Sequence, residues 1–182
     1  MISGYVLSCV GDERAFSHVE SRSGKTLSDI SIKAALIGKK NVKHYSFLER
    51  GSDERQYCAP NINLPVSGFC RSKYHVYPEY HTSADNFDVV TKDGLNGSFE
   101  VIKSVIDGFE TCLIPKHSFL GEPQMSKYNL YYNISAGGNA DKQIKLRMDL
   151  LAYIDGEKNI FEITRILNKP LDLIIKEIKV LL

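Results

Sequence analysis

The chain has 182 residues, of which 43% are apolar and 25% are charged, and its formal net charge at pH 7 is +1. This balance is typical of a folded protein with one domain, or one domain and a small second unit, and it excludes a disordered chain. A net charge near zero gives no long-range attraction for nucleic acid or an anionic membrane, and no apolar run approaches the ~20 residues of a membrane span. We therefore expect neither a nucleic-acid nor a membrane partner.

The N-terminal residues predict a strand at 4–10 rather than a secretory signal. The apolar run is short, ends at Gly11, and has no basic stretch before it. The four cysteines contain no C-x-x-C pair, so we do not expect a structural zinc knuckle. Without a signal peptide, we interpret them as reduced, mostly buried thiols and expect the protein to be cytoplasmic.

The next segments predict a helix followed by a second strand. Residues 26–37 have apolar side chains at helical spacing, and either Thr26 or Ser28 can cap the helix. Residues 44–48 form a short strand candidate. A strand, a helix and a strand in this order favour an α/β fold, in which we expect 4–10 and 44–48 to be neighbouring parallel strands.

Residues 49–88 predict no regular element and are rich in Gly, Pro, Asn, Ser and Tyr. Long irregular segments in compact domains are usually functional loops or disordered linkers. This segment carries more aromatic residues than a free linker tolerates, which favours a packed loop. Helical periodicity returns at 95–109, and we expect this helix to pack on the sheet.

The composition changes again after a connector at 122–145. Residues 144–154 and 160–167 each predict a helix, and Pro170 is well placed in the first turn of a third. Three short helices favour a helix-turn-helix or winged-helix-like unit at 146–182, following a domain at 1–121.

The predicted helical unit does not have the charge of a typical DNA-binding unit. Its basic and acidic residues balance, with six of each between 146 and 182. DNA-binding units normally carry a basic face. We therefore expect this unit to bind protein or to pack against the rest of the chain.

Two polar clusters lie inside the irregular segment, at 51–54 and at 80–85. The second contains His81 and Asp85, and a neutral imidazole binds zinc well when a nearby carboxylate orients it. By spacing alone, such a pair is more often a surface turn closed by a hydrogen bond. The clusters gain meaning from their wider context.

Four stretches of the sequence are informative together: Cys9-Val10-Gly11-Asp12, Gly51-Ser52-Asp53-Glu54-Arg55-Gln56-Tyr57-Cys58, Tyr77-Pro78-Glu79-Tyr80-His81-Thr82-Ser83 and Glu122-Pro123-Gln124. They resemble the C-terminal half of bacterial zinc aminopeptidase-like proteins with an M28-type zinc-exopeptidase fold, a subfamily associated with polysaccharide biosynthesis. In such peptidases a Ser-Asp pair precedes a zinc-binding His-Thr by nearly thirty residues, and here Asp53 and His81 are 28 positions apart. Members of the subfamily also carry a winged-helix-like C-terminus.

The resemblance implies a fold and a set of site residues. It implies part of a three-layer α/β domain with a mostly parallel sheet, followed by the small helical unit. His81 corresponds to the zinc ligand, Asp85 takes a structural role beside it, and Asp53 shapes the loop or the substrate pocket. The other four histidines match no ligand of the family.

The resemblance also implies that the site in this chain is incomplete. The family's remaining ligands and its catalytic Glu correspond to positions upstream of Met1, and the strand at 4–10 ends without the carboxylate of two-metal relatives. Cys9 stands near that position and is expected to be a core residue. We therefore expect one zinc ion, bound only when the missing half is present, and no activity of this chain alone.

Two functions remain open at this point. The first is a zinc-dependent aminopeptidase or related amidohydrolase, acting on a peptide or small amide, of which this chain is one part. The second is a non-catalytic interaction or scaffold protein built on a remnant of a peptidase-like domain. In either case an exposed edge of the sheet predicts a homo-oligomer or a complementary N-terminal chain as partner.

Overall fold

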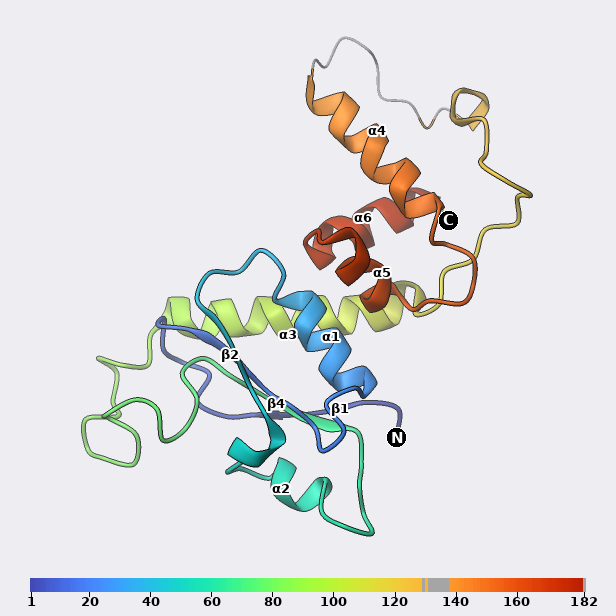
Figure 1. Cartoon of the computed structure of the whole chain (residues 1–182). Coiled ribbons are helices and arrows are strands. Elements are labelled where there is room, and N and C mark those ends of the chain that lie inside the picture. Colours follow the sequence, from blue (N-terminus) through green and yellow to red (C-terminus); the bar gives the residue numbers. More distant parts are fainter. Residues whose placement is uncertain (129, 131–137, 182) are drawn as a thin grey trace.

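The computed structural model describes residues 1–128, 130 and 138–181. Its N-terminal part folds around a four-stranded sheet (Figure 1). The strands are β1 (Gly4–Leu7), β2 (Phe16–Val19), β3 (Val42–Tyr45) and β4 (Val66–Cys70), in the spatial order β1-β4-β2-β3. β1 pairs with β4 and β2 with β3 in parallel, whereas β2 and β4 are antiparallel. The predicted α/β class with a mostly parallel sheet is therefore confirmed.

The predicted pairing of the strands at 4–10 and 44–48 is wrong. β1 and β3 lie at opposite edges of the sheet and run in opposite directions, because β4 and β2 lie between them. Neither of the two central strands, β2 and β4, is predicted from the sequence. β4 contains Ser67 and Gly68 among its five buried residues, so it shows neither an apolar run nor an alternating pattern. A helical crossover does join two parallel neighbours, but these are β2 and β3.

The helices of the N-terminal part begin at side-chain caps. α1 (Leu27–Ala35) follows Thr26, whose backbone N–H donates to Asp29 at 2.9 Å in a capping box. α3 (Lys92–Cys112) follows Thr91, whose hydroxyl accepts the N–H of Gly94 at 2.9 Å. Both helices confirm the predictions at 26–37 and 95–109, and α3 is longer at each end. α2 (Glu54–Tyr57) is a single turn in the segment expected to be irregular.

The sheet lies between two layers (Figure 1). On one face Phe69 of β4 shares a core with Ile32 of α1 and Val101 of α3. On the other face Val19 and Tyr74 belong to a smaller cluster, beside α2 and the chain that follows β4. The larger core contains side chains of both the sheet layer and the C-terminal helices.

Three helices form the C-terminal unit: α4 (Gly138–Leu151), α5 (Ile160–Leu167) and α6 (Leu171–Leu181). α5 has the predicted bounds, and α4 begins earlier than the predicted 144. Phe161 of α5 is fully buried in the core that α1 and α3 also line, so the unit packs directly on the α/β layer. The predicted division at 121 and 146 stays a prediction, and part of the predicted connector lies outside the described residues. Among the helices that are described, none has the length and apolar character needed to cross a membrane.

Replacing Gly94 with alanine is expected to lower the free energy of unfolding by about 1–3 kcal/mol. A Cβ atom at this position would lie 1.8 Å from the carbonyl oxygen of Gly11, so α3 and the loop after β1 would have to move apart. The same oxygen accepts the N–H of Thr91 at 2.9 Å, which ties the two segments together.

Urea denaturation followed by circular dichroism measures this loss. Asn96→Ala is the matched control, because Asn96 is exposed on the same helix and alanine there only improves helix propensity. A Gly94→Ala protein as stable as the wild type would contradict the close backbone contact.

Candidate functional site

The predicted zinc ligand, His81, lies in the segment between β4 and α3, residues 71–91, which we call the motif loop. The loop consists of turns and extends from the sheet as a long excursion (Figure 1). His81 is exposed, has a left-handed backbone conformation with φ of 58°, and stacks on the ring of Tyr80 with 4.1 Å between centroids. Tyr80 packs in turn against the cluster that contains Val19 and Cys70. The stacking therefore ties His81 to the sheet through Tyr80.

The two predicted carboxylates have separate local roles. Asp85 is exposed and accepts a hydrogen bond from the Tyr77 hydroxyl at 3.1 Å, which closes the loop around His81. Burial, followed by the neighbouring Cys9 and then Asp85, raises the pKa of Tyr77. Asp53 is exposed at the start of α2, where its carbonyl accepts the N–H of Gln56 at 2.9 Å. Neither carboxylate hydrogen-bonds to His81 in the described part of the chain, so their roles in a metal site stay predictions.

Glu54, next to Asp53, is the residue that sequence reasoning missed. It is completely buried, and its Oε1 accepts hydrogen bonds from the N–H of Gly51 at 2.9 Å, the N–H of Ser52 at 3.1 Å and the Tyr74 hydroxyl at 2.6 Å. Burial by itself raises the pKa of Glu54, but these donors outweigh it and lower the pKa below its usual value. Glu54 begins α2 and the buried Cys58, four residues later, is its C-cap, and this spacing was the available signal.

Glu54 therefore links two parts of the predicted site region. Its partner Tyr74 is buried at the start of the motif loop, whereas Gly51 and Ser52 belong to the 51–54 cluster. The Oε2 atom of Glu54 is buried and has no hydrogen-bond partner among the described residues. Burial and the adjacent carboxylate raise the pKa of Tyr74, so both groups keep their roles as acceptor and donor at neutral pH.

A second buried carboxylate, Asp12, holds the beginning of the motif loop from the other side. It accepts hydrogen bonds from the N–H of Ser72 at 2.7 Å and from its hydroxyl at 2.8 Å. The neighbouring Arg14 forms two hydrogen bonds of 2.8 Å with Glu79, farther along the loop. Cys9-Val10-Gly11-Asp12 thus contacts the segment that carries His81, although the two are far apart in sequence.

Arg71 fixes the point at which the motif loop leaves β4. It is buried, donates to the carbonyls of Ala15 at 2.7 Å and Gly94 at 3.1 Å, and places its guanidinium over the ring of Phe16. The loop base is therefore joined to β2 and to the first turn of α3. The buried anchors Asp12, Glu54 and Arg71 support a loop whose tip is exposed.

The described residues do not form a zinc site by themselves. A catalytic zinc requires about three protein ligands, and the described residues contain no group of three His, Cys, Asp or Glu side chains arranged to hold a metal. His18 is buried with its Nε2 3.2 Å from Asp29, and His44 packs against it. His75 contacts the rings of Tyr74 and Tyr80. His81 alone does not fit a complete catalytic zinc site, and we derive no catalytic step through a metal.

Cys9 and Cys70 lie near the motif loop as free thiols. Burial, followed by the neighbouring Cys9 and Glu54, raises the pKa of the Cys70 thiol to about 12. Cys70 therefore stays protonated and unreactive at neutral pH. The prediction that the cysteines are reduced in the cell stays a prediction.

Comparison with known proteins links this region to peptidases. Residues 1–111 match the family model of a domain of unknown function, DUF4910, and residues 113–182 match a winged helix-turn-helix model. A Clostridium acetobutylicum protein named "Putative polysaccharide biosynthesis protein with aminopeptidase-like domain" is 31% identical over 166 residues, which are 88% of this chain and 37% of the relative. The chain thus spans little more than a third of that relative's length.

A solved structure agrees with this relationship. The crystal structure described as a "putative peptidase" from Clostridium acetobutylicum superposes with a TM-score of 0.79 at 27% identity. The match covers 100% of this chain and 40% of that chain. The sheet, the motif loop and the helical unit therefore all have counterparts in one larger protein.

Proposed function

The chain belongs to the DUF4910 family, and we propose that it is the part of an aminopeptidase-like zinc hydrolase that carries one metal ligand, His81. The proposed reaction is hydrolysis of an N-terminal peptide bond or a similar amide, and the relative's name favours a role in polysaccharide biosynthesis. The observation that carries the proposal is the motif loop. Asp12 and Glu54 hold its base by buried hydrogen bonds, while His81 at its tip is exposed.

The other ligands and the general base are proposed to come from a complementary chain. One histidine cannot retain a catalytic zinc, since such sites use about three protein ligands. The Clostridium acetobutylicum structure is matched over only 40% of its chain, so most of that protein has no counterpart here. We propose a polypeptide equivalent to the remainder as the partner that supplies these groups.

Two neighbouring features suit such a partner. β1 pairs only with β4 in the described sheet, so its other edge offers free backbone groups to a further strand. Leu7 of β1 is 51% exposed, and Phe99 and Ile106 of α3 are 62% and 53% exposed. An added strand and its flanking apolar residues would cover these surfaces, as in a larger α/β domain.

A mixing experiment tests the role of His81. The purified chain is expected to show no zinc-dependent cleavage of an aminoacyl-p-nitroanilide. Adding the part of the Clostridium acetobutylicum relative that lies outside the matched region is expected to restore cleavage. His81→Ala should then lower the rate by more than ~100-fold, since even residues that only support metal ligands usually contribute 10–100-fold.

His75→Ala is the matched control. His75 lies in the same loop, is exposed, has a left-handed φ of 64° and also contacts Tyr80. His75→Ala therefore removes a histidine from a similar setting without removing the proposed zinc ligand. Equal rates for the His81→Ala and His75→Ala mixtures would remove His81 from the site. If the two polypeptides form a stable complex that cleaves no substrate, the scaffold function is favoured. If this chain instead associates with itself, a second copy of the chain is the partner.

A further inference from the structure

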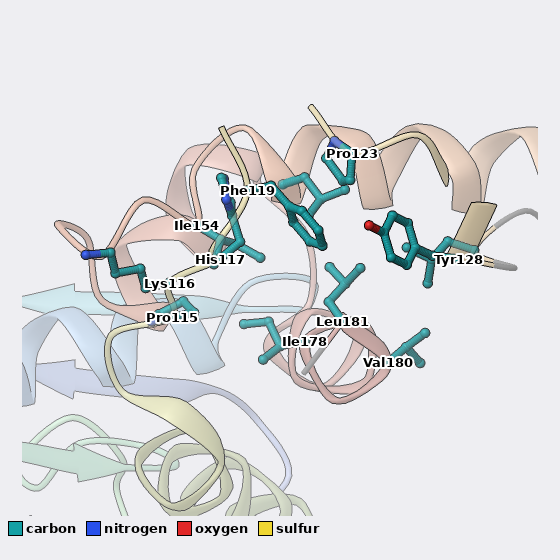
Figure 2. Close-up of a pocket in the computed structure, with 12 residues that line it drawn as sticks. Pro115, Lys116, His117, Phe119, Pro123, Tyr128, Ile154, Ile178, Val180 and Leu181 are labelled. Atoms are coloured by element: carbon teal, nitrogen blue, oxygen red, sulfur yellow. The ribbon is translucent and has the colours of Figure 1, made fainter. Parts of the chain in front are cut away.

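An apolar cavity of about 260 Å³ lies between residues 115–128 and the C-terminal helices, and Leu130 also lines it (Figure 2). Phe119 and Tyr128 line one side, and Ile178 and Leu181 of α6 line another. In Figure 2 the Leu181 side chain points toward the rings of Phe119 and Tyr128, and His117 lies on the opposite side of the cavity from Tyr128. The cavity is remote from the motif loop in sequence and shares no lining residue with it.

Backbone pairing fixes one wall of the cavity. The N–H of His117 donates to the carbonyl of Ile154 at 3.1 Å, and the N–H of Gly156 donates to the carbonyl of Pro115 at 3.1 Å. Lys116 and Asp155 form the antiparallel bridge between them. The segment that follows α3 is therefore held against the turn between α4 and α5, and it does not lie loosely on the surface.

A buried ion pair fixes the other end of the cavity. Arg147 of α4 donates to Glu177 of α6 from Nη2 at 2.8 Å and from Nε at 3.0 Å. The same guanidinium donates to the carbonyl of Leu130, a lining residue. One arginine thus joins two helices and the segment that closes the cavity, which gives the cavity a defined shape.

One residue that lines the cavity, His117, has a buried ring nitrogen, Nδ1, without a hydrogen-bond partner among the described residues. A buried polar group without a partner is costly, and such groups in native proteins usually indicate a bound water, ion or ligand. The side chains around it are mostly apolar, so a single polar group on a ligand would be enough.

We propose that this cavity binds a small neutral molecule with one aromatic ring and one hydroxyl group, a simple phenol, whose hydroxyl pairs with His117. A cavity of about 150 Å³ holds benzene, so this one has room for a substituted single ring. Phe119 and Tyr128 have ring centroids 5.3 Å apart and offer aromatic surface to such a ring. Lys116 is the one Lys, Arg, Asp or Glu among the lining residues and is exposed, so the apolar wall favours a neutral ligand over a charged one.

Two ligands of nearly equal shape test the proposal. The full 182-residue chain is titrated with 4-methylphenol and with toluene, and binding is followed by NMR chemical shifts. Both are expected to saturate shifts of residues around the cavity, with 4-methylphenol binding about 2–10-fold more tightly because of its hydrogen bond. No saturable binding, or equal affinity for the two ligands, would overturn the proposal.

Two variants locate the site and the hydrogen bond. Leu181→Trp, near the end of α6, is expected to fill the cavity and abolish binding of both ligands. His117→Leu is expected to retain toluene binding and lose the preference for 4-methylphenol, while His75→Leu in the motif loop changes neither. A preference that survives in His117→Leu, or binding that survives in Leu181→Trp, contradicts the assignment. If either variant fails to fold, the affinities of the wild type for the two ligands still test the proposal.

Discussion

Replacing Asp29 with alanine is expected to lower the free energy of unfolding by about 3–5 kcal/mol. Asp29 is fully buried at the start of α1 and accepts hydrogen bonds from the N–H and hydroxyl of Ser21 at 2.8 and 2.5 Å. It also accepts the N–H of Thr26 at 2.9 Å and lies 3.2 Å from Nε2 of the buried His18. Alanine would leave these groups buried without partners, and urea denaturation measures the loss.

The pH dependence of stability distinguishes the contribution of the Asp29 charge from that of its side-chain packing. Burial alone raises the pKa of this carboxyl, but the hydrogen bonds from His18, Ser21 and Thr26 outweigh it and hold the pKa well below its usual value. A lowered pKa stabilises the fold above the unfolded value of about 3.9, and that contribution is lost as the pH falls through the folded value. The difference in free energy of unfolding between the wild type and Asp29→Asn should therefore be largest at pH 6 and should shrink progressively below pH 4.

An exposed carboxylate provides the control for Asp29. Asp149 pairs with Lys145 one turn away on α4, with side chains 41% and 75% exposed. Asp149→Ala should cost no more than ~0.5 kcal/mol, the usual value of an exposed helical pair. If Asp29→Ala were equally mild, the buried network would not hold α1 to β2 as described.

Replacing Phe161 with alanine is expected to cost about 3–5 kcal/mol. The ring is fully buried, and it lies so close to α3 that a Cβ on Gly108 would be 2.7 Å from it. Its centroid is also 4.9 Å from that of Phe109. The cavity left by alanine would open between α3 and α5, where the helical unit meets the α/β layer.

This substitution also tests whether the two units unfold together. The chain has no tryptophan, so far-ultraviolet circular dichroism and tyrosine fluorescence are the two probes. We expect coincident transitions in the wild type because one core joins both units. Ile166→Ala, on the exposed face of the same helix, should change stability by less than ~1 kcal/mol. A loss below ~1 kcal/mol for Phe161→Ala would show that the units fold independently.

For the candidate site, the motif stretches indicate which region matters but not which of its side chains are buried. The sequence predicts that Asp53 and His81 belong to one site, and this stays a prediction. The segment between them was expected to be an irregular packed loop, but it contains the central strand β4. The sequence did not distinguish Asp53, which is exposed, from Glu54, whose carboxylate is buried and ties the loop to the 51–54 cluster. Adjacent acidic residues look alike in sequence, and only the direction in which α2 packs on β4 decides which one is buried.

The sequence by itself determined the α/β class, the helices at α1, α3 and α5, and the C-terminal helical unit. Local signals carry these features: a cap such as Thr26 or Asn159, an apolar face at helical spacing, and the residue that ends the helix. Helix boundaries depend mainly on neighbours within one or two turns, so a single chain contains the information.

Tertiary structure alone decided the strand order, the anchors of the motif loop and the cavity beside α6. β4 pairs with both β1 and β2, although 58 residues lie between the end of β1 at Leu7 and Val66, and 46 lie between the end of β2 at Val19 and Val66. The Ser and Gly residues of β4 give no apolar pattern. Likewise His117 and Ile178 line one cavity only because α6 folds back over the chain after α3. Such contacts depend on how distant segments pack together, and the spacing of residues along the sequence does not predict this packing.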